Sequence, residues 1–600
     1  MKYQGTRSET LWLAALAVAC ALSQAPLAEM PVMSFDEVRA GMIGEGRTVF
    51  RGTEIETFKV EILGKLSNIG PDQDLILALC TGGPLEHTGV MAGMSGSPVM
   101  VDGKLIGAIA YSWGFAKDAI AGITPIEQML AIPQREADRR VAAAATPLAL
   151  DALERLYVPE LLDRFFASQS ERLMLRAGTP LPTAVPLAVS GIRAEALFRD
   201  MPGLTAAGFL PMQTGGAGID AAPSPPLEPG SAVGLKLVRG DIEMTATGTV
   251  TWTHDDEVLA FGHPLFGLGA TDLPMTGATV QALLPSLQQS SKVATPLAEV
   301  GALRQDRASG IYGRVGVSPR MIPVRLQLSG SDSERTFSFD VADDPLLAPL
   351  LLFVSLRGVL DSRERTFGSA SIRLREGSVI KMASGDDVAL DNLFSGPSAM
   401  TVGTAISAYI LHLLMNNAWE QPQIAGVNLI LDFDERPQTA RIRRASLSRY
   451  RAHPGETVRV TVVLQPYRGA QRVLTREMLI PPETAPGVLT VGVTGAVAAM
   501  RSESQGERLV PQDLDQLIRL INRLRRNDQV YIMATRDDWG VVLEGSRLPS
   551  LPPSVARVLS RPRTRGNLTL VARRTILEET IDTDYLIEGA TRLRLEVEAP

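Results

Sequence analysis

The stretch AGMSGSPVMVDGKLIGAIAYSWG, residues 92–114, sets a serine among small residues directly ahead of two apolar runs. Asp102-Gly103 separates these runs. Both residue types adopt positive φ readily, so the pattern predicts a β-hairpin. Ser95 lies in the turn that leads into the hairpin. The residues alone allow two interpretations of this turn: it exposes a nucleophile, or it is an ordinary Gly-Ser turn before a strand.

The residues around Ser95 suit a nucleophile of acyl transfer. The run GMSGSP supplies Gly93, Gly96 and Pro98 at fixed distances from the serine. The backbone N–H groups of Gly93 and Ser95 can then point to one spot and form an oxyanion hole. Glycine permits the required backbone angles and leaves room for a substrate. Ser95 is therefore the candidate nucleophile, and Gly93 and Ser95 are the candidate oxyanion-hole donors.

A serine nucleophile needs a general base, and the chain has five histidines: His87, His254, His263, His412 and His453. His263 stands out because it ends a β-like run, in VLAFGHPLFGLG. A strand-to-loop junction is a usual place from which a side chain enters a cleft. His87 precedes Ser95 by eight residues and is the alternative, although its surroundings are typical of a loop histidine.

Several segments resemble the SpoIVB-type serine peptidase family. LEHTGVMAGMSGSPVMVDGKLIGAIAY and AGITPIEQML are similar to its serine-bearing segment, and VLAFGHPLFGLGATDLPMTGA to its histidine-bearing segment. SSKVATPLAEVGALRQDRASGIYGRVG resembles the stretch that follows. The resemblance covers residues 35–133 and 230–324. It implies a trypsin-like fold, Ser95 as nucleophile, His263 as general base, and no cofactor.

Two departures from the family pattern affect this expectation. The histidine segment comes first in the family's namesake, whereas here Ser95 precedes His263 by 168 residues, which suggests two half-barrels in permuted order. The namesake also has an aspartate about fifteen residues before its serine, where this chain has Cys80. The third triad residue stays open: Asp272 is the first candidate and Asp306 the alternative. Either is equally well explained as a loop aspartate.

The N-terminus has the features of an export signal over residues 1–28. Lys2 and Arg7 precede a short apolar run that ends in small residues. The run is too short to span a membrane comfortably. Cys20 sits in a poor match to a lipoprotein signal, so no lipid anchor is expected. We therefore expect an exported protein, periplasmic or extracellular, in which Cys80 is the one remaining cysteine and no internal disulfide forms.

The rest of the chain divides by composition. We expect a mainly β protein with α segments: a trypsin-like double β-barrel core with permuted halves, followed by a β-rich part with an immunoglobulin-like sandwich. Apolar runs near residues 345–360 and 400–419 predict buried helices, and residues 511–526 predict an amphipathic helix. The expected boundaries are 34–135 for the serine-bearing half, 136–229 for a helical and Pro/Gly-rich insertion, 230–345 for the histidine-bearing half, 346–428 for an α/β connecting region and 429–600 for the β-rich C-terminal region.

The leading functional hypothesis is an exported serine endopeptidase that acts on a protein or peptide substrate, its own chain included. One alternative is an inactive peptidase-like envelope protein with a binding or assembly role. Another is a hydrolase of other esters or amides. The net charge of −7 argues against a broad nucleic-acid surface. No spacing of ligand-type residues suggests a metal site, and no phosphate-binding or dinucleotide loop is present, so no cofactor is expected.

Overall fold

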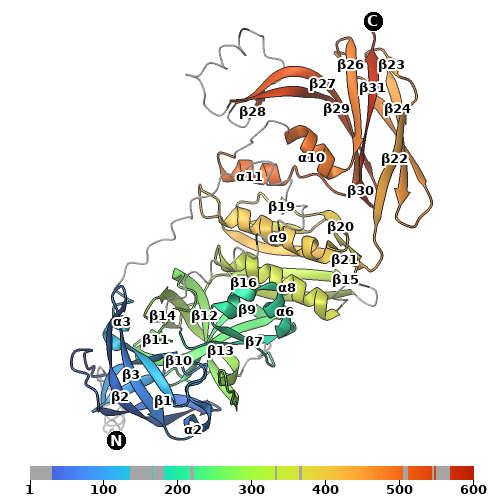
Figure 1. Ribbon diagram of the computed structural model, residues 1–600. Coiled ribbons are helices and arrows are strands. Elements are labelled where there is room, and N and C mark those ends of the chain that lie inside the picture. The colour runs from blue at the N-terminus through green and yellow to red at the C-terminus, as the bar shows by residue number, and fades with distance from the viewer. Residues whose placement is uncertain are drawn as a thin grey trace, which may run out of the picture.

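The structure is a computed structural model that describes residues 30–134, 162, 165, 182–216, 222–330, 334–363, 368–504, 511–543, 546–548, 554 and 568–599. The expected signal peptide and most of the expected helical insertion lie outside these residues. The described chain is mainly β, as expected. Figure 1 shows an elongated molecule, with a barrel near the N-terminus at one end and two C-terminal sheets at the other.

The serine-bearing half forms a closed six-stranded barrel in the order β1-β2-β3-β6-β5-β4. Its interior holds apolar side chains such as Val60, Ile76 and Ile106. The predicted hairpin is confirmed, because Asp102 and Gly103 have φ values of 49° and 74° between β4 and β5. The strands are β1 (Ile43–Arg51), β2 (Glu54–Gly70), β3 (Gln73–Thr81), β4 (Pro98–Val101), β5 (Lys104–Ser112) and β6 (Ile120–Pro125), and the short helix α3 (Ile126–Leu130) follows.

The histidine-bearing half belongs to a second, larger sheet that has fifteen strands among the described residues. Within it, β10 and β11 form a hairpin whose turn holds Asp255 and Asp256. His254 and these two aspartates thus form a polar hairpin turn. The strands of this half are β9 (Ala232–Gly240), β10 (Glu243–His254), β11 (Glu257–Ala260), β12 (Gly269–Leu284), β13 (Ser291–Arg307) and β14 (Gly310–Val315).

Part of the expected insertion is integrated into this sheet instead of forming a separate Pro/Gly-rich segment. Strand β7 (Val185–Ser190) pairs antiparallel with β10, and β8 (Phe209–Gln213) pairs parallel with β7. Between them lie two short helices, α6 (Ala194–Asp200) and α7 (Pro202–Ala206). The cause is the apolar run VPLAVS, which gains more from burial in the sheet than from exposure in a loop.

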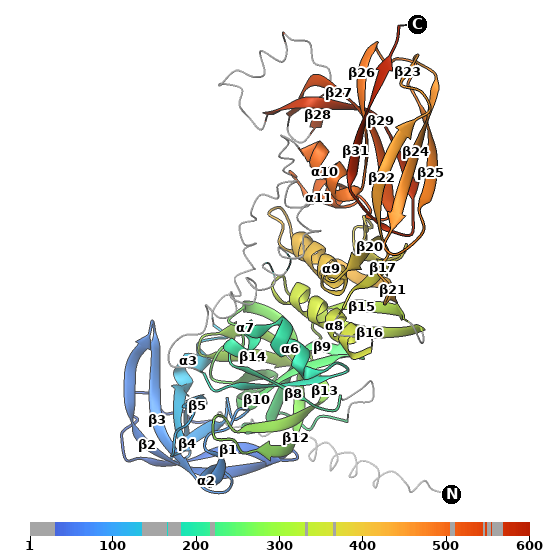
Figure 2. The same ribbon diagram turned by 45° about the vertical axis from the view of Figure 1, so that its right-hand side comes forward.

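The same sheet continues into the α/β region, where both predicted buried helices are found: α8 (Leu347–Arg363) and α9 (Ala399–Met415). They cover one face of the sheet beside β15 and β21 (Figure 2). No helix in the described ranges has the length and apolarity needed to cross a membrane. The strands here are β15 (Met321–Ser329), β16 (Glu334–Ala342), β17 (Ala370–Leu374), β18 (Val379–Met382), β19 (Val388–Ala389), β20 (Asn392–Gly396) and β21 (Ile424–Asp434).

The C-terminal region packs two further sheets around one core that contains Val460, Val491 and Ile532. This agrees with the expected sandwich. The predicted amphipathic helix is shorter than expected: α11 (Leu514–Ile521) begins where the Asp513 side chain accepts from the Gln516 N–H. The remaining elements are β22 (Thr439–Leu447), β23 (Arg451–Ala452), β24 (Thr457–Pro466), β25 (Arg472–Leu479), β26 (Gly487–Thr494), α10 (Ala496–Ser504), β27 (Gln529–Leu543), β28 (Ser546–Leu548), β29 (Leu568–Asp582), β30 (Leu586–Glu588) and β31 (Ala590–Val597).

Candidate active site

The serine turn connects the short helix α2 (Leu85–Thr88) to β4 and requires glycine at two positions. Gly93 and Gly96 have φ values of 93° and 96°, which L side chains rarely adopt. A Cβ on Gly96 would also lie 1.9 Å from the carbonyl oxygen of Thr249. The Gly96 N–H donates to the carbonyl of Ile109 at 2.7 Å, so the turn is fastened to β5.

Strand β10 of the second sheet holds the serine turn from the other side. Thr249 donates its N–H to the Ser95 carbonyl at 2.7 Å and its hydroxyl to the Gly93 carbonyl at 2.9 Å. The Thr251 hydroxyl donates to the Gly96 carbonyl at 2.8 Å. These three bonds join the two halves at the candidate nucleophile. Sequence reasoning missed them, although the alternation in TATGTVTWT would have indicated threonines on one face of the strand.

His263 lies in the loop between β11 and β12, and the preceding glycine brings it to the barrel. Gly262 packs on β5, because a Cβ there would lie 3.1 and 3.2 Å from the Cβ atoms of Ala108 and Ala110. The Gly262 carbonyl accepts from the Thr124 hydroxyl at 2.6 Å. The structure thereby brings together the two residues singled out from the sequence: Ser95 Oγ is hydrogen-bonded to His263 Nε2.

The other ring nitrogen determines the tautomer of His263. Nδ1 lies 2.8 Å from the carbonyl oxygen of Pro264. Since a carbonyl only accepts, Nδ1 carries the proton and Nε2 presents its lone pair to Ser95. Burial lowers the pKa of His263 to about 4, and the Pro264 carbonyl opposes this shift. The ring is thus a neutral acceptor near pH 7. The Ser95 hydroxyl has a second acceptor, the Phe261 carbonyl at 3.0 Å.

The first acid candidate does not lie where a third triad residue would. The Asp272 carboxylate pairs with Arg304 at 2.8 Å and accepts the Arg320 N–H at 3.0 Å. No contact joins it to His263 in the described ranges. β12 leads away from the histidine loop, and Arg304 on the paired strand β13 attracts the carboxylate there. Cys80 is buried in the barrel, where desolvation raises its pKa to about 12.

Asp306, the alternative acid, contacts the histidine loop but not the ring. Its carboxylate is buried and accepts the N–H groups of Leu265 at 2.8 Å, Phe266 at 2.8 Å and Leu268 at 3.2 Å. Burial raises the pKa of Asp306, while these backbone bonds act in the opposite direction. The residue therefore sets the shape of the loop that follows His263.

The N–H groups of Gly93 and Ser95 have no hydrogen-bond partner among the described residues. An oxyanion hole needs donors that are not used by the fold, so these two N–H groups meet that condition, and their role stays a prediction. The dyad itself is closed to solvent, because Ser95 is 0% and His263 1% exposed. The other four histidines lie elsewhere: His87 is in α2, His254 ends β10, His412 is in α9, and His453 contacts the carbonyl of Ala599.

A second buried group near the serine turn escaped sequence reasoning. Lys292, at the start of β13, is 1% exposed and donates from Nζ to the Thr48 hydroxyl at 2.6 Å. Its backbone N–H donates to the Ala92 carbonyl at 3.1 Å. Burial lowers the pKa of this amine to about 7, an effect that Glu56 opposes. A lysine in an otherwise polar run carries no sequence signal of its burial.

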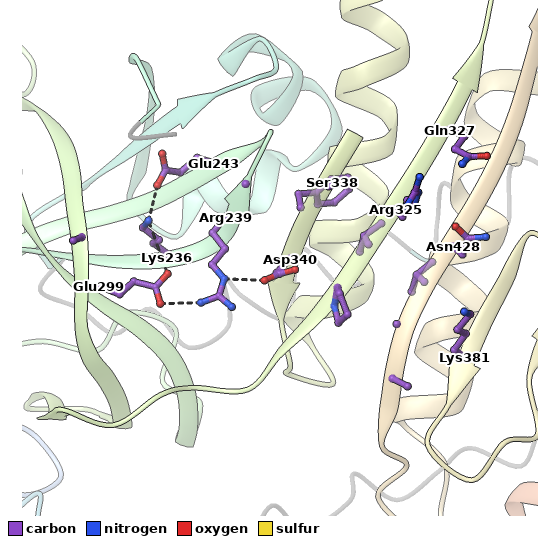
Figure 3. Close-up of a pocket in the computed structure, with 18 residues that line it drawn as sticks. Lys236, Arg239, Glu243, Glu299, Arg325, Gln327, Ser338, Asp340, Lys381 and Asn428 are labelled. Atoms are coloured by element: carbon purple, nitrogen blue, oxygen red, sulfur yellow. Dashed lines mark hydrogen bonds and ion pairs between the residues drawn. The ribbon is translucent and has the colours of Figure 1, made fainter. Parts of the chain in front are cut away.

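A cavity of about 910 Å³ lies apart from the dyad, between β9 and β13 on one wall and β15, β16 and β21 on the other (Figure 3). Its charged side chains largely pair with one another. Lys236 meets Glu243 at 3.0 Å, and Arg239 meets Glu299 and Asp340 at 2.8 Å each. No histidine lines it, so it offers no serine–histidine pair. The part of the chain that the structure describes has no cluster of metal-ligand residues.

Comparison with known protein families agrees with the serine segment. Residues 20–130 match the family described as SpoIVB peptidase S55. This match confirms the resemblance for the serine-bearing segment and indicates a serine peptidase, hence a protein or peptide substrate. The histidine-bearing half lies beyond the matched residues. No curated protein and no solved structure matches the chain.

Proposed function

We propose that this chain, whose nucleophile segment matches the SpoIVB peptidase family, is a serine endopeptidase that uses Ser95 and His263. The observation that carries the proposal is the hydrogen bond between Ser95 Oγ and His263 Nε2. The two side chains, 168 residues apart in the sequence, contact each other, and His263 is in the tautomer that a general base needs. A buried serine with only a structural role would not require a neutral imidazole at its hydroxyl.

The proposed reaction proceeds through an acyl-enzyme. His263 Nε2 removes the Ser95 proton while Oγ attacks the carbonyl carbon of the scissile peptide bond. The tetrahedral oxyanion accepts hydrogen bonds from the N–H groups of Gly93 and Ser95. His263 then gives the proton to the departing amine, and the C–N bond breaks. Water hydrolyses the ester by the same route, with His263 as base and then acid.

In this proposal the Pro264 carbonyl takes over the orienting role that a triad assigns to an aspartate. It accepts from Nδ1–H and keeps the tautomer correct. A neutral carbonyl stabilises the imidazolium less than a carboxylate does, so we expect modest turnover. Asp306 acts as a positioning residue, since it holds the loop that carries Pro264 through the N–H groups of Leu265 and Phe266.

Export to the periplasm or outside the cell is part of the same proposal. It rests on the charged start and apolar run within residues 1–28. N-terminal sequencing of the protein from fractionated cells tests it. We expect a start near residue 29 outside the cytoplasm, and an intact N-terminus on cytoplasmic protein would contradict this expectation.

The decisive experiment is labelling with a fluorophosphonate probe, followed by mapping of the modified residue. We expect slow modification of Ser95 that Ser95→Ala abolishes. Ser97→Ala is the matched control, because Ser97 is also buried and two residues away but its hydroxyl has no partner in the described ranges. His263→Gln should slow labelling at least about 10²-fold, in line with loss of a general base, while His87→Gln should leave it unchanged.

Cleavage of a casein-type substrate then distinguishes the enzyme class. Peptide hydrolysis that disappears in Ser95→Ala supports the endopeptidase. Probe labelling with hydrolysis of small esters only would favour the other hydrolase class. No labelling under any condition would overturn the enzyme proposal in favour of a binding or assembly protein.

A further inference from the structure

The segment just before β7 lies against the strand beside the nucleophile. Pro182 and Tyr111 of β5 form an antiparallel β-bridge, and the Thr183 N–H donates to the Ala110 carbonyl at 2.8 Å. We call residues 182–184 the strap. Antiparallel pairing along a strand edge is how an extended peptide is commonly bound. The strap therefore makes, within the chain, the backbone contacts that an extended substrate would make.

The paired part of β5 belongs to the candidate active site. Ile109 accepts the Gly96 N–H at 2.7 Å and donates to the Ser97 carbonyl at 3.0 Å, so β5 adjoins the serine turn. A Cβ on Gly262 of the histidine loop would lie 3.2 Å from the Cβ of Ala110, the next residue. A peptide on this edge would lie beside both members of the dyad. The strap occupies that place.

The chain beyond the strap then reaches the oxyanion hole. Pro186 Cγ would lie 3.3 Å from a Cβ on Gly93. Pro186 comes three positions after Thr183, a span of about 10 Å in extended chain. The chain thus connects the β5 edge to the neighbourhood of the candidate oxyanion-hole glycine within this length. The dyad, which adjoins both β5 and Gly93, is almost fully buried.

Two features indicate that the strap blocks the site instead of serving as a bound substrate. The N–H groups of Gly93 and Ser95 have no partner in the described ranges, so no strap carbonyl occupies the oxyanion hole. The Thr183 hydroxyl is buried and has no partner there either. An unpaired buried hydroxyl costs free energy, which makes the strap easier to displace than a well-paired strand.

We propose that the strap is an autoinhibitory segment: it occupies the peptide-binding edge of β5, stays uncleaved, and must leave before a substrate can reach Ser95. This inference rests on the proposed function and adds its regulation. A partner that binds the strap, or a substrate that displaces it from β5, would activate the enzyme.

A reversible crosslink tests the proposal directly. Residues opposite each other in a non-hydrogen-bonded antiparallel pair have Cα atoms about 4.5 Å apart, within the range of a disulfide. The double variant Tyr111→Cys/Pro182→Cys should label with fluorophosphonate at least tenfold more slowly when oxidised than when reduced. Tyr111→Cys alone is the control and should not respond to oxidation. Equal labelling of the oxidised and reduced double variant would overturn the proposal.

A further variant weakens the strap without a crosslink, and a matched variant serves as its control. Thr183→Pro removes the N–H that donates to Ala110, and we expect labelling of Ser95 to accelerate about five- to tenfold, the effect of one hydrogen bond. Thr183→Ser keeps the donor and should label at the wild-type rate. Mass spectrometry of the incubated wild type should find residues 182–184 intact, and a cut there would overturn the inhibitory role.

Access to position 95 can also be measured without catalysis. In a Ser95→Cys background, Thr183→Pro should accelerate alkylation of the new thiol, and mass spectrometry separates this signal from Cys80. If no variant reacts with fluorophosphonate but alkylation still accelerates, the strap is supported and the peptidase proposal fails. If Ser95 labels equally fast in every variant, the peptidase stands and the strap proposal fails.

Discussion

The backbone N–H of Leu265 donates to Oδ1 of Asp306 at 2.8 Å, across 41 residues of sequence. This bond, with those from Phe266 and Leu268, anchors the loop whose Pro264 carbonyl orients His263. In Asp306→Asn, an NH2 group replaces one carboxylate oxygen, so a hydrogen-bond donor faces a backbone N–H that is also a donor. We expect kcat to fall at least tenfold with KM little changed, and stability to fall by about 1–3 kcal/mol. Steady-state kinetics and urea unfolding measure the two effects.

Asp272→Asn should behave differently, because its carboxylate pairs with the partly exposed Arg304. We expect labelling of Ser95 within about threefold of wild type and a stability loss of no more than about 1 kcal/mol, the usual range for such an ion pair. The labelling rate and urea midpoint test this. A loss of activity equal to that of Ser95→Ala would show that Asp272 serves His263 in a form not seen here.

The rate of Ser95 labelling should decline only at unusually low pH. Burial lowers the pKa of His263 to about 4. Only the neutral ring can accept the Ser95 proton, so labelling should be constant above this pKa and decline as pH falls through it. Labelling rates between pH 3.5 and 8, corrected for unfolding with a stability curve, give the midpoint. A midpoint near 6.5, the ordinary histidine value, would mean that the ring titrates in water and that the dyad is open.

Lys292 should make the protein more stable at alkaline pH. Its pKa is about 7 in the fold and near 10.4 in an unfolded chain. Between these values the unfolded state binds more protons, so the free energy of unfolding rises with pH by about 1.4 kcal/mol per unit. Below pH 7 this stabilisation is absent, because the amine is charged while buried. Urea unfolding at pH 7.5 and 9 should show the rise in wild type but not in Lys292→Met. Lys59→Met, on the exposed side of β2, is the control.

Gly96 should tolerate no side chain, since a Cβ would meet the Thr249 carbonyl at 1.9 Å. Gly96→Ala should separate the serine turn from β10, abolish labelling and cost several times the destabilisation of the control. Gly103→Ala is that control: its φ is also positive, at 74°, but nothing lies within 4 Å of its Cβ position. It should cost only about 1–2 kcal/mol of backbone strain. Equal effects of the two variants on stability and labelling would contradict the docking role of Gly96.

Much of the local structure could be predicted because it depends on neighbouring residues. Asp102-Gly103 forms the hairpin turn, and the apolar runs form α8 and α9. The histidine could be selected because only one of the five ends an apolar β run between glycine and proline. Strands β7 and β8 could not be predicted, because their surroundings are rich in proline and glycine. The apolar run of β7 is short, and it becomes a strand by pairing with β10.

The acid candidates show where sequence distance fails as a guide. Asp272 lies nine residues from His263, yet the extended strand β12 carries it toward Arg304. Asp306 lies 43 residues away, and the antiparallel return of β13 brings it back, opposite Gly269. A β-strand advances about 3.3 Å per residue, so a short separation within a strand is a long distance, while strand pairing closes a large separation.

The sequence by itself determined the glycine-framed turn around Ser95, the hairpin after it and the choice of His263, since each depends on backbone angles and patterns within a few residues. Only the tertiary structure decided that the two meet, that a backbone carbonyl serves Nδ1, and that Pro182 and Thr183 pair with the β5 edge. These contacts arise when the barrel docks on the second sheet through Thr249 and Thr251. Docking depends on the shape and hydrogen bonding of two surfaces assembled from distant segments, which no local pattern encodes.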